Sequence, residues 1–247
     1  MPNEPSKKLQ LFPNLWAKEA PVLAVPRPVC NCLSGQSRNL LLHTEAQDTE
    51  CVAWQRLNEL IDTAARDGRE TFSPGRELSP VEWTQITTLP PSIAKLKAVK
   101  HLILYGSSLV WIPPEIGELE SLEEFTPYTS YRLHWFPYEI LRCKNLTRST
   151  ISTRALYGNY KRRPPFPRLP QLHSAFVPQT CSVCNSPFTT ESVHQAWISL
   201  RVATDVVPLL VHACSAECIA QLPTPPENYI QTPHKGGLQL QQPAPYH

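Results

Sequence analysis

Residues 86–131 read ITTLPPSIAKLKAVKHLILYGSS followed by LVWIPPEIGELESLEEFTPYTSY, two copies of one pattern. A third copy, RLHWFPYEILRCKNLTRSTISTR, spans 132–154 once one extra residue is allowed. Each copy has a proline after its first apolar column, at Pro90, Pro113 and Pro137. A repeat of 23 or 24 residues predicts units that stack side by side, because one such unit cannot bury its own apolar side.

The apolar residues of the three copies align in columns and predict one short strand and one return segment per copy. Stacking of the copies makes the strands parallel. The expected strands are 99–105, 122–128 and 146–152, and LPPSIAKL, IPPEIGEL and FPYEILRC are expected to return along the convex side. The columns are Leu89, Ile112, Phe136; Ile93, Ile116, Ile140; Leu96, Leu119, Cys143; and Val99, Leu122, Leu146.

The motif LPxxIxxLxxLxxLxL resembles the leucine-rich-repeat family, in particular its short intracellular class with 23-residue repeats. The resemblance covers about a quarter of the chain. It implies a curved solenoid with a concave binding face and no intrinsic catalytic residues. The sequence departs from the family pattern at Ser149 in the third expected strand and at Pro127 in the second.

The predicted fold is α/β: a short leucine-rich-repeat solenoid with a parallel sheet, a helical N-terminal cap and a small irregular α+β module at the C-terminus. Terminal repeats expose apolar edges that need capping elements. An amphipathic helix is expected over 50–69, with Gly68 as its stop, and the segment after 154 is expected to cover the other edge. The predicted organisation is an irregular arm 1–49, a cap 50–85, repeats 86–154, a Pro/Arg-rich connector 155–180, a four-Cys module 181–230 and a polar tail 231–247.

Strand positions between the buried columns are expected to point to the concave face. Their mixture of tyrosines, charges and hydroxyls resembles the composition of protein interfaces, so we expect a protein partner there. An ordinary solvated sheet face is the alternative. The candidate contact residues are Lys100, His101, Ile103, Tyr105, Glu123, Glu124, Thr126, Tyr128 and Arg148.

The segment FTPYTSYRLHWFPY, residues 125–138, holds six aromatic residues in fourteen. Such a density indicates either core filling or an exposed anchor patch. We expect Phe125, Trp135 and Phe136 in the core, and Tyr128 and Tyr131 at the surface.

Four cysteines form two close pairs, Cys181 with Cys184 as Cys-x2-Cys and Cys214 with Cys218 as Cys-x3-Cys. Two such pairs can complete the tetrahedral coordination of Zn²⁺, so the sequence predicts a structural zinc site without an open position for catalysis. The alternative is that these cysteines are small buried hydrophobes, like any of Cys30, Cys32, Cys51 and Cys143. His212 is expected to point away from the thiols.

The remaining histidines show no clustering in the sequence that indicates a second metal site. His43, His101, His134 and His173 are expected to be surface or packing residues.

The composition excludes several classes of protein. A net charge of +2, from 23 basic and 21 acidic residues, is too balanced to indicate nucleic acid or an anionic membrane as the main partner. There is no run of about 20 apolar residues and no signal-peptide pattern, so we expect a cytoplasmic protein without a membrane span. The sequence holds no Gly-rich phosphate loop, Gly-x-Ser-x-Gly elbow or His-Glu-x-x-His helix. A non-catalytic, protein-binding adaptor is the function predicted.

Two other functions stay open at this point. The first is a nucleic-acid-binding protein that uses the four-Cys module and a basic segment, and a steep salt dependence of binding would favour it. The second is a cysteine-dependent ligase-type effector with Cys181 or Cys214 as nucleophile, which needs a base such as His212 and a thiolate free of metal. The basic segment holds Arg154, Lys161, Arg162, Arg163 and Arg168.

Overall fold

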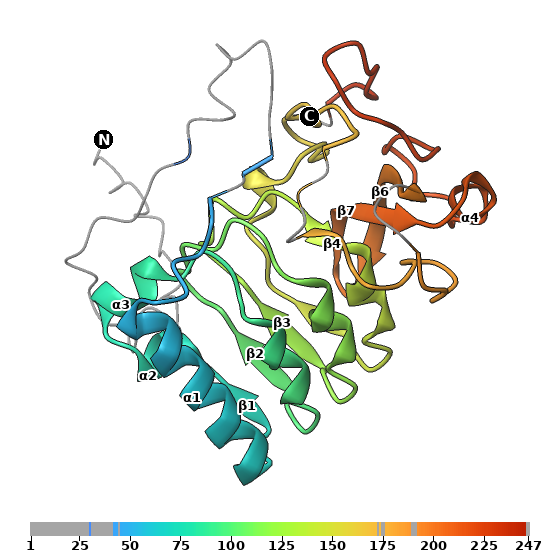
Figure 1. The fold of residues 1–247 in the computed structure, drawn as a ribbon. Coiled ribbons are helices and arrows are strands. Elements are labelled where there is room, and N and C mark those ends of the chain that lie inside the picture. The colour runs from blue at the N-terminus through green and yellow to red at the C-terminus, as the bar shows by residue number, and fades with distance from the viewer. Residues whose placement is uncertain are drawn as a thin grey trace, which may run out of the picture.

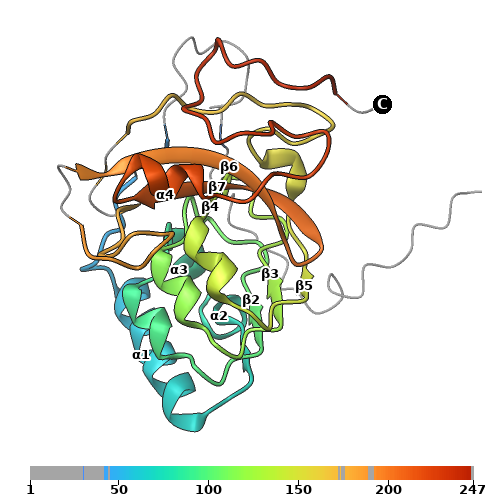
Figure 2. The ribbon, with the colours of Figure 1, turned by 90° about the vertical axis from the view of Figure 1, so that its right-hand side faces the viewer.

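The computed structural model contains a four-stranded parallel sheet with the strand order β1-β2-β3-β5 (Figures 1 and 2). The model describes residues 30, 42–43, 45–171, 173, 176–188 and 192–245. The chain is therefore of the α/β class, with helices and a mostly parallel strand arrangement. The strands are β1 (Thr71–Phe72), β2 (His101–Ile103), β3 (Glu124–Thr126) and β5 (Arg148–Ser149).

The strands β2, β3 and β5 lie inside the three segments predicted from the repeat, and they are shorter than predicted. Their register places Leu102 opposite Phe125, and Phe125 opposite Ser149. Interstrand hydrogen bonds continue beyond the strand ends, from Leu104 N to Thr126 O at 3.0 Å and from Gly106 N to Tyr128 O at 2.8 Å. Successive copies of the sequence pattern are thus neighbours in the sheet.

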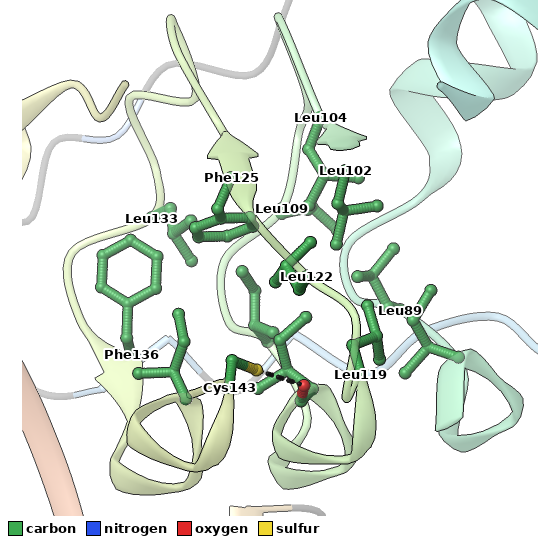
Figure 3. Packing of buried hydrophobic residues seen from close by; sticks show 14 of the residues in the cluster. Leu89, Leu102, Leu104, Leu109, Leu119, Leu122, Phe125, Leu133, Phe136 and Cys143 are labelled. Carbon is green, nitrogen blue, oxygen red and sulfur yellow. Dashed lines mark hydrogen bonds between the residues drawn. The ribbon is translucent and has the colours of Figure 1, made fainter. Parts of the chain in front are cut away.

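Each copy returns through a short 3₁₀ helix, and these three helices lie side by side (Figures 1 and 3). Proline precedes each of them with φ near −70° and an extended ψ, so the fixed φ of proline sets the entry to each return segment. The column of Ile93, Ile116 and Ile140 is buried beneath them. The helices are η1 (Pro91–Lys95), η2 (Pro114–Glu118) and η3 (Tyr138–Arg142).

The space between strands and return segments is filled by the apolar columns (Figure 3). Leu102, Phe125 and Phe136 are fully buried, and the rings of Phe125 and Phe136 meet edge to face at 5.9 Å between centroids. Cys143 takes a leucine position in the third copy, and its thiol donates to the Ile116 carbonyl at 3.2 Å. Each large side chain buried in this way contributes roughly 1.5–3 kcal/mol to folding.

The N-terminal edge of the sheet is covered by α1 (Val52–Asp67), which confirms the helix predicted over 50–69. Its buried face is Ala53, Leu57, Ile61 and Ala64, and it ends at Gly68, whose φ of +61° is the left-handed conformation that glycine tolerates. The strand β1 and two short helices that follow it were not expected from the sequence. They are α2 (Pro74–Glu77) and α3 (Pro80–Gln85).

The opposite edge is covered by a long hairpin of β6 (His194–Val202) and β7 (Asp205–Ala213). Figure 2 shows the hairpin running across the repeats toward β5. At its turn, the Thr204 hydroxyl accepts from Ser149 N at 3.2 Å, and the Ser149 hydroxyl donates to an Asp205 carboxylate oxygen at 2.7 Å. The departure from the repeat pattern at Ser149 therefore has a physical reason: this residue meets a polar turn rather than another repeat.

The hairpin and the repeats share one core. The strand β4 (Phe136–Pro137), from the third copy, pairs in parallel with β7, so that Phe136 lies opposite Leu209. Ile198, Val207 and Leu209 belong to the same cluster of buried residues as the repeat columns. The 181–230 segment is thus continuous with the repeat core.

A second apolar cluster forms around Trp197, which is fully buried and donates from Nε1 to the Pro167 carbonyl at 2.9 Å. The connector and the tail both join it. Backbone hydrogen bonds pair Trp197 with His234, and Leu169 N donates to Lys235 O at 2.7 Å. The cluster contains Leu42, Val110, Trp111, Trp135, Tyr157, Phe166, Leu169, Phe176, Trp197 and Leu210.

No helix in the described part of the chain is long and apolar enough to cross a membrane.

Replacement of Gly117 by alanine should destabilise the stack, because η2 and η3 touch there. A Cβ at Gly117 would lie 2.5 Å from the Glu139 carbonyl oxygen, closer than van der Waals contact allows. We expect Gly117→Ala to lower the free energy of unfolding by about 1–3 kcal/mol in urea denaturation. The exposed neighbour Glu118 gives the control, since Glu118→Ala removes only a surface ion pair worth at most about 1 kcal/mol. Equal effects of the two substitutions would contradict this account of the contact.

Titration of His234 should make the stability depend on pH. Its ring packs edge-on against Phe166 at 4.6 Å, its Nδ1 accepts from Gly236 N, and burial lowers its pKa to about 4. The ordinary pKa is about 6.5, so the neutral ring's contribution is complete above pH 6.5 and is lost as the pH falls toward 4. His234→Asn keeps a short acceptor and removes the titration. Between pH 7 and pH 4.5, the stability advantage of the native chain over this variant should shrink by about 2 kcal/mol. A pH-independent difference in urea unfolding would contradict the assignment.

Candidate metal centre

The first cysteine pair lies in a tight turn closed by a bridge between Thr180 and Pro187. Within it, Cys181 N donates to Ser186 O at 2.8 Å, and Asn185 N donates to Cys181 O at 3.0 Å. Asn185 has a φ of +62°, a left-handed conformation that asparagine adopts more readily than most residues. The turn brings the thiols of Cys181 and Cys184 to the same side.

The second pair lies where β7 ends and α4 (Ala216–Ala220) begins. Cys214 directly follows the last residue of the strand, and Cys218 is in the helix. Ser215 is the N-cap, and its hydroxyl accepts from Cys218 N at 3.3 Å. The sharp change from strand to capped helix brings these two thiols together.

The four sulfur atoms converge, and all lie within 4.8 Å of one another. Cys214 Sγ is 3.6 Å from both Cys184 Sγ and Cys218 Sγ. A tetrahedral site with metal–sulfur bonds of about 2.3 Å has sulfur–sulfur edges of about 3.8 Å. The cluster of Cys181, Cys184, Cys214 and Cys218 therefore has the dimensions to hold a metal ion.

Backbone amides point at the most deeply buried thiol of the cluster. Val183 N and Cys214 N both lie 3.4 Å from Cys181 Sγ, and Cys181 has no exposed surface. Amide donors of this kind are outer contacts that orient a ligand of a metal ion. A buried thiolate is costly unless a positive charge lies beside it, and a bound cation supplies that charge.

The thiols of Cys184, Cys214 and Cys218 shift one another's pKa. Hydrogen bonds from Ser186 and from neighbouring thiols lower the pKa of Cys184 to about 6. Hydrogen bonds with Cys184 and Cys218 raise the pKa of Cys214 to about 12, and burial raises the pKa of Cys218. Four thiolates at this spacing repel one another, whereas a metal ion deprotonates the thiols that coordinate it and removes the repulsion.

His212 does not belong to the thiol cluster. Its ring is buried, and Nε2 lies 2.9 Å from the side-chain amide nitrogen of Gln195. Burial also lowers its pKa to about 4. The expectation that His212 points away from the cysteines agrees with this contact.

A second group of metal-ligating side chains was missed in the sequence analysis: Cys30, His43 and His134 lie together. The expectation that the histidines form no second cluster was wrong. Cys30 and His134 are 104 positions apart, and no spacing pattern links them. Only the folded chain brings these residues into contact.

The sheet face carries the predicted contact residues in rows across the strands. His101, Glu124 and Arg148 are opposite one another on β2, β3 and β5. A Glu124 carboxylate oxygen lies 3.6 Å from His101 Nδ1 and 3.0 Å from the Arg148 guanidinium. Lys100 is engaged separately, with its Nζ 2.6 Å from Glu70. The first row therefore places one carboxylate between an imidazole and a guanidinium, and we call it the charge ladder.

The second row on this face is aromatic. The rings of Tyr105 and Tyr128 lie 6.2 Å apart, and Tyr128 is 39% exposed. Ile103 and Glu123 are half-buried, whereas Thr126 is only 6% exposed and offers little surface to a partner. Tyr131, three residues after Tyr128 in the sequence, is 61% exposed. Phe125, Trp135 and Phe136 are all buried, which confirms the prediction that they fill the core.

The basic segment is only partly exposed. Arg163 donates to the carbonyls of Gly158 and Ala244 and stacks over the ring of Tyr229 at 5.5 Å, so its charge serves an internal contact. The side chains of Arg154, Lys161, Arg162 and Arg168 are exposed.

No protein-family model matches the chain, and no curated protein is found to be similar to it. A function is therefore inferred from this chain's own residues, in particular from the four-Cys cluster and the face of the parallel sheet.

Loss of one thiol should abolish metal binding at the four-Cys cluster. Cys184 is exposed, so Cys184→Ser changes the donor with little effect on packing. We expect this variant, purified without chelator, to hold one metal equivalent less by elemental analysis and to melt at a lower temperature. Cys51→Ser is the matched control, because Cys51 is the N-cap of α1 and serine is a preferred N-cap residue. An unchanged metal content in Cys184→Ser would contradict the assignment.

Proposed function

We propose that this chain is a non-catalytic leucine-rich-repeat protein that binds a protein partner through its sheet face and uses Zn²⁺ at the four-Cys cluster as a structural ion. The observation that carries the proposal is the ordered face of β2, β3 and β5, where a charge ladder and a pair of tyrosines lie side by side. The repeat pattern, the parallel register and the proline before each return segment support membership of the leucine-rich-repeat class.

The charge pattern of the face favours a protein over a nucleic acid as the partner. Glu123 and Glu124 place negative charge among His101 and Arg148, and a phosphate backbone would be repelled there. A polypeptide can complement alternating charges and pack against Tyr105 and Tyr128. Tyrosine gives a large contact area at small loss of conformational entropy, and it is enriched among residues that dominate binding energy.

Zinc suits the four-Cys cluster because soft thiolate ligands in a tetrahedral arrangement select it. Four protein ligands leave no position for a water molecule, which makes the role structural. The site joins the 180–187 turn to the end of β7 and to α4, and Arg142 of η3 donates to the Cys181 carbonyl at 3.4 Å. A zinc ion here would hold the C-terminal segment against the last repeat.

The two alternatives have less support. For nucleic acid, Arg163 of the basic segment is already engaged within the chain. For cysteine catalysis, a base would have to face a metal-free thiol, and Nε2 of His212 is bonded to Gln195 instead.

The proposal can be tested with charge reversal on and off the sheet face. Arg148→Glu, combined with Tyr128→Ala, changes both rows of the face, whereas Lys144→Glu reverses an exposed charge just after the third return segment. Tagged full-length chains would be used to recover partners from extracts of the source cell, and affinity for a recovered partner would be measured by calorimetry. We expect the double variant to weaken binding at least tenfold, equivalent to about 1.4 kcal/mol, and Lys144→Glu to have less than a twofold effect. A partner whose affinity is unchanged by the double variant, or recovery of no partner that responds to it, would contradict the proposal.

A further inference from the structure

Three metal-ligating atoms from distant parts of the chain converge on one point. Cys30 Sγ lies 3.0 Å from His43 Nε2 and 3.1 Å from His134 Nε2. The two imidazole rings stack with their centroids 5.3 Å apart. His134 is only 1% exposed, and His43 and Cys30 are half-buried.

The other nitrogen of each ring is held by an oxygen acceptor. Both carboxylate oxygens of Glu45 lie 3.0 Å from His43 Nδ1, and the Ala155 carbonyl lies 2.5 Å from His134 Nδ1. A carboxylate or a carbonyl accepts only, so both rings carry their proton on Nδ1. In its neutral form, each ring then has its lone pair on Nε2, directed toward Cys30.

This arrangement fits a metal ion better than a Cys–His catalytic pair. A nucleophilic cysteine needs one imidazole as base, and a thiol has one proton to share between two Nε2 lone pairs. A cation instead accepts both lone pairs and the thiolate at once. The oxygen acceptors on Nδ1 are the outer contacts that orient histidine ligands of metal ions. Glu45 is in turn bound by Arg132, which fixes that outer contact.

We propose that Cys30, His43 and His134 form a second metal site, separate from the four-Cys cluster, for an ion of the Zn²⁺ type. One thiolate and two imidazoles are donors that Zn²⁺ prefers. With bonds of about 2.3 Å to sulfur and about 2.0 Å to nitrogen, a tetrahedral ion needs sulfur–nitrogen separations of about 3.5 Å. The group has to open by about half an ångström to admit the ion. A fourth ligand is not assigned within the described residues, and Cys32 lies outside them.

The site would join the N-terminal arm to the repeats. Cys30 belongs to the 1–49 segment, and His134 precedes the strand β4 in the third copy. The ring of His134 also contacts that of Tyr157 at 5.2 Å, so the ligand is held by the second apolar cluster. An ion at this point would fix residue 30 against the body of the protein.

The test uses the full-length chain in a Cys184→Ser background, which removes the four-Cys site and leaves the second site to be measured alone. Metal-free protein would be titrated with Zn²⁺, and Co²⁺ would be added as a spectroscopic probe of thiolate ligation. We expect one equivalent to bind, with a thiolate-to-cobalt charge-transfer band that Cys30→Ser abolishes. His43→Ala should also abolish binding, and it replaces a half-buried side chain that the fold tolerates more readily than a change at His134.

A substitution outside the ligands separates metal binding from a folding defect. Glu45→Gln leaves all three ligands in place, weakens the outer contact to His43 and removes the ion pair with Arg132 that fixes this contact, so the affinity for Zn²⁺ should fall about 10- to 100-fold. Glu59→Gln, on the exposed side of α1, is the matched control and should leave the affinity unchanged. Absence of a bound equivalent, or Zn²⁺ affinity unaffected by both His43→Ala and Glu45→Gln, would overturn the proposal. Alkylation of Cys30 at the same rate with and without Zn²⁺ would overturn it as well.

Discussion

Burial of the apolar columns between neighbouring copies of the repeat is the interaction on which the rest of the structure depends. A copy of 23 residues has one short strand and one 3₁₀ turn, and neither hides its apolar side alone. The columns of Ile93, Ile116 and Ile140, and of Leu102 and Phe125, become buried only because the next copy lies alongside. The order of the sheet, the parallel direction of its strands and the position of the charged ladder all follow from that requirement.

The sequence could predict the parts of the fold that local pattern determines. The three strand positions, the α1 helix with its stop at Gly68, and the cap at Ser215 each depend on residues close together in the chain. The pairing of Cys181 with Cys184 and of Cys214 with Cys218 was also visible, because close spacing is what a turn or a helix start needs to bring two thiols together. The short helix α3 could also have been predicted, because Ser79 and Glu82 have the spacing of a capping box and form one in the structure.

What the sequence could not predict are contacts set by tertiary packing. The pairing of β4 with β7 joins Phe136 to Leu209, and nothing in either segment marks the other as its neighbour. The same holds for Cys30 and His134, which are 104 positions apart in the chain and meet only in the folded structure. Thr126 was expected at the open face because it alternates with buried positions, yet it is covered almost completely. Alternation predicts the side of the sheet to which a residue points, but not what lies over it.

Ser149 contacts the turn between β6 and β7, and this contact limits how the chain can change in evolution. Its polar contacts with Thr204 and Asp205 occupy the edge where a fourth copy of the repeat would have to add. Phe136 and Pro137 of the third copy are also committed to the neighbouring sheet through β7. Lengthening by duplication is therefore compatible with this architecture only ahead of the third copy, because the third copy is bound to the hairpin at both places.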